Sequence, residues 1–405
     1  MTSEVKERIE QIRHGNVPEG YVRSKRGIIP QDWNCCRIED FCFLKSGDTI
    51  TSSRINKNGK YPCYGGNGLR GYTDNFTHDG RHVLIGRQGA LCGNVKFVAG
   101  AFYASEHAVV VTTKNNSLMK YCYYLFDNMN LNQYSESSAQ PGLSVEKLLR
   151  LFTAIPELSE QDRIAQILSA QDEVIELKEK LLSEKQRQKK YLMQQLLTGK
   201  KRLPGFNGEW QSCRLHQIAK RIRRKNTVGN ENVLTISAQY GLINQSDFFN
   251  KEIASEDKSN YYLLQRNDFA YNKSYSSGYP FGAIKRLTRY DIGIVSPLYI
   301  CFEIVGENVY LEYMEQYFEA GLMNREIQAF AQEGARNHGL LNIAVDDFFN
   351  SKIILPSLEE QQAIAAILSA ADKEIELLRQ DLEQEKRKKT ALMQLLLTGI
   401  VRVNV

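Results

Sequence analysis

Residues 156–199 read PELSEQDRIAQILSAQDEVIELKEKLLSEKQRQKKYLMQQLLTG, and residues 356–399 read PSLEEQQAIAAILSAADKEIELLRQDLEQEKRKKTALMQLLLTG. About half of the aligned positions are identical without a gap, at a constant offset of 200 in the numbering, which marks an internal repeat. Each copy has a proline at its start and a glycine at its end, and no helix breaker lies between them. We therefore predict one long helix per copy.

The apolar residues of these copies predict that the two helices pair with each other. In the second copy they follow a spacing of three and four, and the first copy keeps the same frame with polar interruptions. This pattern is typical of a coiled-coil seam, on a helix that spans about 65 Å. About 150 residues leave the end of the first helix and enter the start of the second. Because a compact domain has its termini close together, we expect the helices to run antiparallel.

The repeated unit extends beyond the helix. The phrase at 29–33, IPQDW, resembles LPGFNGEW at 203–210, and a similar Cys-Arg pair follows each phrase. We therefore expect a unit of connector, globular domain and long helix that occurs twice, with a pseudo-twofold relation between the copies. The expected segments are an N-terminal helix and connector (1–33), a first globular domain (34–154), a first long helix (155–202), a connector with a second globular domain (203–354) and a second long helix (355–405).

Both globular segments show short strand patterns separated by glycine-rich turns. The first has strand patterns at 81–86 and 108–112 and a helix pattern at 119–128. The second has strand patterns at 232–237, 268–272, 294–302 and 351–355 and a helix pattern at 312–320. The predicted fold class is α+β, with two globular domains held apart by two long antiparallel coiled-coil helices.

Composition sets the broad class of the protein. A net charge of +5 is compatible with nucleic-acid binding but does not demand it. No apolar run is long enough to cross a bilayer, and Glu4, Glu7 and Glu10 argue against a secretory signal. The eight cysteines show no metal-binding spacing. We expect a cytoplasmic protein with reduced thiols and no membrane partner.

The usual signatures of catalysis are missing from the sequence. Residues 66–71 match the letters of the dinucleotide-binding glycine pattern, but the sequence predicts neither an apolar strand before them nor a helix after them. His78 and His82 have the spacing of metal ligands on a helix, but Asp79 and Gly80 between them predict a turn. We therefore expect a binding or scaffold protein, with no catalytic residues, no cofactor and no metal.

Side chains suited to DNA lie on the predicted loops. Arg87 and Gln88 follow a predicted strand, and arginine pairs with guanine and glutamine with adenine in the major groove. A basic run in the second domain would serve phosphates. A solvated polar loop is the competing interpretation for each segment. The candidate DNA contacts are Lys45, Arg54, Asn67, Arg70, Tyr72, Arg87 and Gln88 in the first domain and Arg221, Arg223, Arg224, Lys225, Lys273, Ser274, Tyr275, Tyr279, Arg336, Asn337 and His338 in the second.

Taken together, these segments resemble the DNA-specificity subunit of type I restriction–modification systems. The resemblance is carried by the doubled helix openings, the doubled Leu-Leu-Thr-Gly closings, and residues 61–68, 84–89, 271–274 and 334–338. It implies two target-recognition domains that each read one half of an asymmetric bipartite site in double-stranded DNA. It also implies that the long helices set the spacing and hold two methyltransferase subunits, which recruit ATP-dependent restriction subunits. The chain itself would be non-catalytic.

Two other classes of function remain open from the sequence. One is a coiled-coil scaffold or DNA-binding regulator without modification partners, and methyltransferase and helicase genes beside this one would argue against it. The other is a methyltransferase or nuclease of unusual sequence, which binding of S-adenosylmethionine by the isolated chain would support.

Overall fold

The computed structural model of the protein contains two compact units, Met1–Glu179 with Gln380–Val405 and Lys180–Arg379. Both long helices contribute to both units, so the segment boundaries given by the sequence stay predictions. The structure describes residues 3–89, 91–114, 118–136, 141–237, 240–248, 257–276, 278–333 and 341–403.

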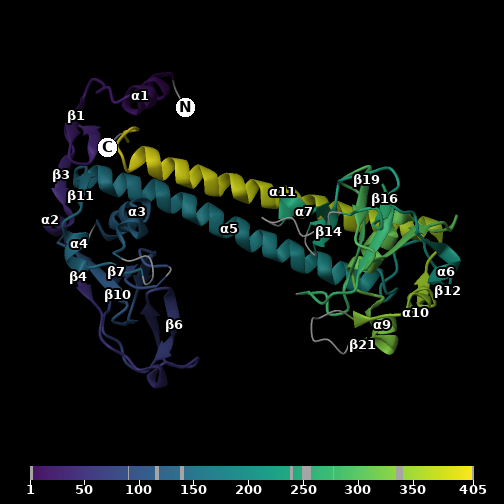
Figure 1. Ribbon diagram of the computed structural model, residues 1–405. Helices are drawn as coiled ribbons and strands as arrows, with labels where there is room; N and C mark the ends of the chain where they lie inside the picture. The colour runs from purple at the N-terminus through teal and green to yellow at the C-terminus, as the bar shows by residue number, and fades with distance from the viewer. Residues whose placement is uncertain are drawn as a thin grey trace. The chain divides into compact units, whose positions relative to one another are not determined.

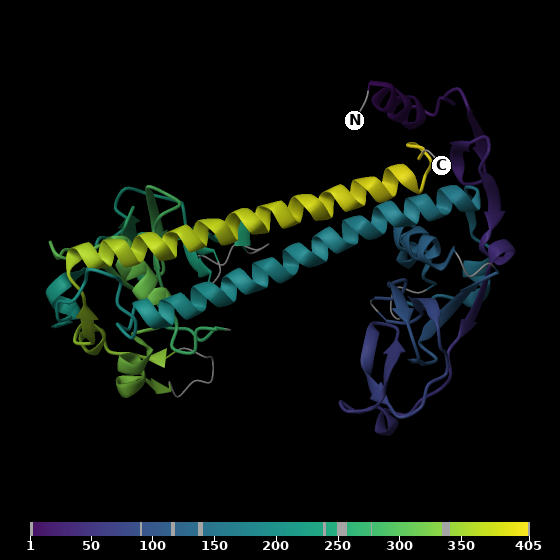
Figure 2. The same ribbon diagram turned by 180° about the vertical axis from the view of Figure 1, so that it is seen from behind.

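The two repeated segments form the helices α5 (Leu158–Leu196) and α11 (Leu358–Leu396), each of 39 residues. Figures 1 and 2 show both as unbroken coils, which confirms the prediction. Their ends are built alike. At the start, Gln161 and Gln361 donate side-chain hydrogen bonds of 2.8 and 2.9 Å to the carbonyl groups of the prolines five residues before them. At the end, the repeated glycines have φ of +68° and +73°, a left-handed conformation that glycine adopts without strain.

The helices pair antiparallel, as predicted. In the first unit Ile164 and Leu168 of α5 lie in one core with Met393 of α11, and in the second unit the residues at the exchanged repeat positions do the same. Two ion pairs share this symmetry: Lys389 and Asp172 lie 2.7 Å apart in the first unit, and Lys189 and Asp372 lie 2.5 Å apart in the second.

The polar residues that interrupt the apolar seam form ion pairs and hydrogen bonds between the two helices. In the first unit Lys178 contacts Asp381 at 2.6 Å and Glu385 at 3.0 Å, and Gln171 donates to Glu385 at 2.7 Å. The hydrogen bond from Gln171 and the charge of Lys178 lower the pKa of Glu385 to about 2. The repeat is therefore not exact, since Ala371 stands where the first copy has Gln171.

The globular part of the first unit is built on a four-stranded antiparallel sheet in the order β4-β10-β7-β8. Helix α3 packs against this sheet, and its Tyr124 donates a 2.7 Å hydrogen bond to Asp172 of α5. A second sheet, in the order β6-β5-β9, carries a hairpin. The elements are α1 (Ser3–Arg13), β1 (Tyr21–Ser24), β2 (Gly27–Pro30), β3 (Asn34–Arg37), α2 (Ile38–Phe41), β4 (Cys42–Ser46), η1 (Ser52–Arg54), β5 (Tyr61–Gly65), β6 (Gly68–Thr73), β7 (Arg81–Gly86), β8 (Val95–Ala99), β9 (Tyr103–Ala104), β10 (Ala108–Thr113), α3 (Met119–Asn128), η3 (Leu131–Tyr134), α4 (Val145–Leu149) and β11 (Phe152–Ile155).

The second unit repeats this plan. Its sheet has the order β13-β20-β17-β18, and helix α8 bonds to α11 through Gln316, which donates to Asp372 at 2.8 Å. The paired strands β3 and β11 of the first unit correspond to β12 and β23 of the second. The elements are β12 (Gln211–Arg214), α6 (Leu215–Ile218), β13 (Ala219–Arg221), β14 (Leu234–Ser237), β15 (Gly241–Asn244), α7 (Gln245–Phe248), β16 (Tyr262–Gln265), β17 (Phe269–Asn272), β18 (Ala283–Arg286), β19 (Ile292–Val295), β20 (Ile300–Ile304), α8 (Leu311–Glu319), α9 (Asn324–Phe330), β21 (Gln332–Glu333), β22 (Leu341–Asn342), α10 (Val345–Phe349) and β23 (Lys352–Leu355).

One predicted strand was wrong. The apolar run at 294–302 is two strands, because β19 ends at Val295 and β20 begins at Ile300. Between them Tyr299 donates a backbone hydrogen bond of 3.1 Å to Ser296, which closes a turn. Pro297 inside this turn has no amide hydrogen to give to a sheet, so the run cannot continue as one strand.

Each unit contains a buried glutamate that accepts hydrogen bonds from an arginine and a tryptophan in the same arrangement. In the second unit Arg202 donates two hydrogen bonds of 2.7 Å to Glu360, and Trp210 donates a third of 3.2 Å. In the first unit Arg402 donates two of 2.7 Å to Glu160, and Trp33 donates a third of 3.1 Å. We call each set of tryptophan, glutamate and arginine a clasp. In both clasps the guanidinium group lies over the indole ring.

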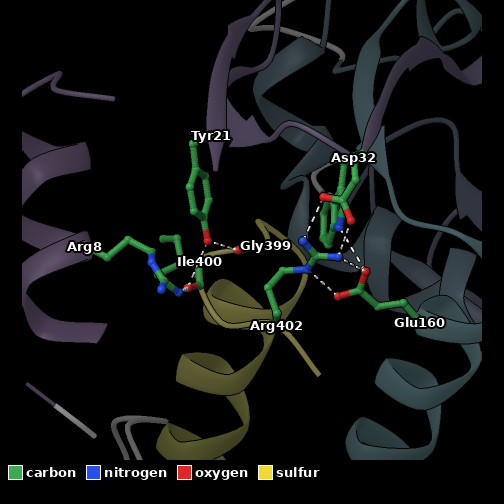
Figure 3. Close-up of polar contacts among 8 residues, drawn as sticks. Arg8, Tyr21, Asp32, Glu160, Gly399, Ile400 and Arg402 are labelled. Atoms are coloured by element: carbon green, nitrogen blue, oxygen red, sulfur yellow. Dashed lines mark hydrogen bonds and ion pairs between the residues drawn. The ribbon is translucent and has the colours of Figure 1, made fainter. Parts of the chain in front are cut away.

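The clasp of the first unit joins the two ends of the chain (Figure 3). Arg402, near the C-terminus, also binds Asp32 at 2.7 and 2.8 Å, and this bond lowers the pKa of the Asp32 carboxyl group. Tyr21 donates a 2.7 Å hydrogen bond to Gly399, and Arg8 of α1 donates one of 2.8 Å to Ile400. Arg402 follows the second long helix and completes the clasp of the first unit. In the same way, Arg202 follows the first long helix and completes the clasp of the second unit.

We predict that Arg402→Met destabilises the first unit and Arg202→Met destabilises the second, each by about 2 kcal/mol. This is between the value for a surface pair and that for a fully buried pair, since each glutamate is buried while its arginine is partly exposed. Hydrogen exchange of α3 and α8 would report on the two units separately. Arg163→Met, an exposed arginine on α5, is the matched control. Equal protection in all variants would contradict the role given to the clasp.

Candidate nucleic-acid interface

The first candidate DNA-reading segment consists of Arg87 and Gln88, directly after strand β7. We call such a segment a reading segment. Arg87 is fixed on three sides, because its amide donates to His107 at 2.8 Å, its carbonyl accepts from Leu143 at 2.9 Å, and its guanidinium donates to Ser46 at 3.0 Å. Gln88 follows and is exposed. The structure therefore presents Gln88 on a rigid backbone, with Arg87 partly engaged by the fold.

The turn between β5 and β6 lies against this segment. A Cβ atom on Gly86 would collide with the carbonyl oxygen of Gly66, and one on Gly66 would lie 2.7 Å from the carbonyl oxygen of Gln88. Only glycine permits so close an approach of the two backbones. It brings the exposed Asn67 next to Gln88. The glycine pattern at 66–71 thus belongs to a β-hairpin, not to the strand–turn–helix of a dinucleotide site.

Arg70 and Lys96 border the same turn. The side chain of Arg70 lies over Gly65, and Cε of Lys96 lies 3.7 Å from the position that a Cβ on Gly68 would take. Both charged residues are exposed. Sequence reasoning missed Lys96, because only the pairing of β7 with β8 brings that residue here and no local signal marks it. We call Asn67, Arg70, Gln88 and Lys96 the β7 edge.

Three candidates of the first domain lie in strands, although the sequence predicted loops. Lys45 is in β4, paired with Val110, while Arg70 and Tyr72 are in β6. Glycines and polar residues hid the alternating pattern of these strands. Tyr72 pairs with Asn56 at the open end of the hairpin, opposite its turn, so the structure does not bring Tyr72 to the β7 edge. Arg54 lies in the 3-10 helix η1. All four predicted contacts are exposed.

In the second domain the segment that leaves β17 corresponds to the segment that leaves β7. The carbonyl of Lys273 accepts a 3.1 Å hydrogen bond from Leu341, as that of Arg87 does from Leu143. Lys273 is half-buried, and this burial lowers its pKa. Next to it Ser274 donates its amide to Asn272 at 3.1 Å. Arg336, Asn337 and His338 fall outside the residues that the structure describes.

The tyrosines of this segment differ in their surroundings. Tyr275 has 64% of its surface exposed. Tyr279 donates a 2.5 Å hydrogen bond to Glu319 of α8, and Lys285 lies over its ring and also bonds to Glu319. Burial raises the pKa of Tyr279. Tyr279 therefore anchors the segment to the fold, and Tyr275 is the one that could stack on a base.

The four basic residues at 221–225 of the second domain also differ in their surroundings. Arg221 is in β13. Arg224 binds Asp268 and Gln265, and Lys225 donates to the carbonyl of Asn260 at 2.7 Å and lies over the ring of Tyr262. Arg223 is exposed, and within the described parts of the chain its side chain forms no hydrogen bond or ion pair. Of this run, Arg223 is best suited to contact a phosphate.

The structure also bears on metals and membranes. His78 stacks on Phe102, His82 meets the same ring edge-on, and the ring centres of the two histidines lie 5.6 Å apart. Among the described residues no group of three or more metal-ligating side chains occurs. In that same set of residues, no helix has the length and apolar character needed to cross a bilayer.

The comparison with known protein families matches both copies of the internal repeat. The family model described as type I restriction modification DNA specificity domain matches residues 30–185 and residues 207–386. The chain belongs to this family. It is 53% identical over 133 residues to the type I restriction enzyme EcoprrI specificity subunit of Escherichia coli, a match that covers 32% of this chain and 33% of that protein. It is 24% identical over 420 residues to the MjaVIII specificity subunit of Methanocaldococcus jannaschii, covering 93% and 94%.

Solved structures give the same fold. The S subunit of the type I restriction–modification system from M. genitalium matches with a TM-score of 0.58 at 14% identity, over 90% of this chain and 96% of that chain. The α+β fold with a long helix pair, expected from the sequence, is thereby confirmed as the fold of this family.

We predict that Gln88→Ala weakens discrimination at one base pair of the DNA site by about 1–3 kcal/mol, the value of one bidentate base contact. Arg87→Ala should have a similar effect and also loosen the fold, since it breaks the bond to Ser46. Competition binding with duplexes that differ at single base pairs measures this. Lys57→Ala, an exposed lysine of the same domain, is the control. An unchanged base preference in both variants would remove them from the reading surface.

Proposed function

We propose that this chain is the DNA-specificity subunit of a type I restriction–modification complex. Each globular domain would read one half of a bipartite site in double-stranded DNA. The observation that carries the proposal is the equivalence of the two candidate reading segments. Arg87 follows β7 and Lys273 follows β17, which occupy corresponding places in the two sheets, and the carbonyl of each accepts a backbone hydrogen bond from a leucine.

Duplication explains why the site should be bipartite. Two copies of one domain face duplex DNA in opposite directions if a twofold axis relates them, as the halves of a dimeric protein do. The reading segments differ in sequence, since Arg87-Gln88 stands in one domain and Lys273-Ser274 in the other. The two half-sites should therefore differ, and the whole site should be asymmetric.

The long helices are the proposed attachment site for two methyltransferase subunits, and through them for restriction subunits. Large apolar side chains are exposed along both helices, among them Val174, Leu177 and Leu181 on α5 and Ile367 and Leu377 on α11. Exposed apolar surface of this kind marks protein–protein contacts. In this proposal the chain works in the cytoplasm and contributes recognition, while its partners contribute the chemistry.

Methylome sequencing of cells that produce this chain with the methyltransferase subunit tests the function. The expected result is one asymmetric motif with two specified halves separated by unspecified bases. Motifs that stay the same without this chain would overturn the proposal. So would a motif that has only one specified half.

The spacing of the halves gives a sharper prediction. Four residues inserted after Leu182 and four after Leu382 should add about 6 Å to the helix pair. Because DNA rises about 3.4 Å per base pair, the unspecified spacer should lengthen by one or two base pairs while both halves stay the same. An insertion in only one helix should break the register of the pair and reduce assembly. A well-assembled double variant with an unchanged spacer would show that the helices do not set the spacing.

A further inference from the structure

Two leucines in the first domain are exposed where the reading segment leaves β7. Leu69 and Leu91 each have 52% of their surface exposed. Leu69 is in β6 between Gly68 and Arg70, directly beyond the hairpin turn. Leu91 lies in the segment that connects β7 to β8. Neither leucine belongs to a hydrophobic core of the domain.

The segments that carry the leucines meet at Gly86. The hairpin turn contacts this residue through Gly66, and a Cβ on Gly86 would lie 3.3 Å from the carbonyl oxygen of Leu91. The connecting segment is closed by two backbone hydrogen bonds, in which Gly86 donates to Asn94 at 2.8 Å and Gly93 donates to Gly86 at 2.7 Å. Gly86 thus holds the backbones of these two segments together, and the leucines lie on the same segments as Gln88 and Asn67.

Both leucines are held on ordered backbone. Leu69 pairs with Tyr64 in the β5–β6 hairpin, and the carbonyl of Leu91 accepts a 3.1 Å hydrogen bond from Asn94. Their exposure is therefore a fixed feature of the folded domain.

The polar residues around the leucines indicate what that partner is. The β7 edge contributes two cations, Arg70 and Lys96, and two amides, Asn67 and Gln88. Cations suit phosphates, and amides suit the edges of adenine. The apolar group that the major groove offers beside such edges is the C5-methyl group of thymine. This combination of cations, amides and leucines on neighbouring segments therefore favours DNA as the partner.

We infer that Leu69 and Leu91 contact thymine methyl groups in the half-site that the first domain reads. This inference rests on the proposed function and adds to it a means of reading. The amides and cations of the β7 edge distinguish bases by hydrogen bonds, and the leucines distinguish thymine from cytosine and from uracil by its methyl group.

The test uses the full chain assembled with methyltransferase subunits and duplexes that contain the methylated motif. Each thymine of the motif is replaced in turn by deoxyuridine, which removes only the methyl group. With the unaltered protein, at least one replacement in the half-site of the first domain should weaken binding about fourfold, which corresponds to about 0.8 kcal/mol for one buried carbon group. Leu69→Ala or Leu91→Ala should abolish that difference, so that both duplexes bind equally.

Phe43→Ala supplies a matched control, because Phe43 is an exposed apolar residue on β4 and does not adjoin Gly86. This variant should keep the fourfold difference. The half-site of the first domain is recognised as the one whose reading changes in Gln88→Ala. Thermal melting of each variant shows whether it is folded.

Several outcomes would overturn the inference while the proposed function stands. They are a specific half-site without any thymine, equal binding of thymine and uracil duplexes by the unaltered protein, and a difference that persists in both leucine variants. Equal weakening of both duplexes by the variants would mean that the leucines pack on base or sugar surface and do not read a methyl group. Absence of any sequence-specific binding would instead overturn the proposed function, and the inference with it.

Discussion

An arginine that holds a buried glutamate, with a tryptophan beneath it, is the constraint on which both units depend. Glu160 and Glu360 lie near the starts of the long helices and are almost fully buried. A carboxylate in such a place costs several kcal/mol unless it is paired. The pairing with Arg402 and Arg202 therefore fixes where each connector meets each helix. Arg402 follows α11, so the first unit combines residues from before α5 with residues from after α11.

The two units share their structural frame and differ in their reading segments. The helix pair, the clasps and the order of the two sheets are common to both units. The segments that leave β7 and β17 occupy equivalent places and carry different side chains. Such a division lets recognition change without altering the frame. Some basic residues of the second domain, such as Arg224 and Lys285, form ion pairs within the fold.

The long helices could be predicted because the spacing of their apolar residues is a local signal and the sequence repeats it. Their antiparallel direction followed from the expectation that the domain between them has its two ends close together. The prediction of one strand at 294–302 was wrong because it gave more weight to the apolar residues than to the Ser-Pro pair at 296–297, which is itself a turn signal in the sequence. The place of Lys96 beside Gly68 depends on the pairing of β7 with β8, which no local pattern encodes. Sequence chemistry predicts Arg87 and Gln88 as base contacts, which stays a prediction, and it could not foresee that the fold engages Arg87 through Ser46. The clasps went unnoticed because their members are distant in the chain.

Chemical cross-linking between the long helices tests the repeated antiparallel frame most directly. Cysteines would replace Lys189 and Asp372 in one variant and Lys189 and Lys389 in another, with Cys35 and Cys213 changed to serine, and a short bismaleimide would be added. The antiparallel frame predicts an intramolecular cross-link in the first variant, whose positions form an ion pair of 2.5 Å. In the second variant the new cysteine lies about 25 Å further along α11, so no cross-link should form. A cross-link in the second variant and none in the first would mean that the helices run parallel, and would contradict this account.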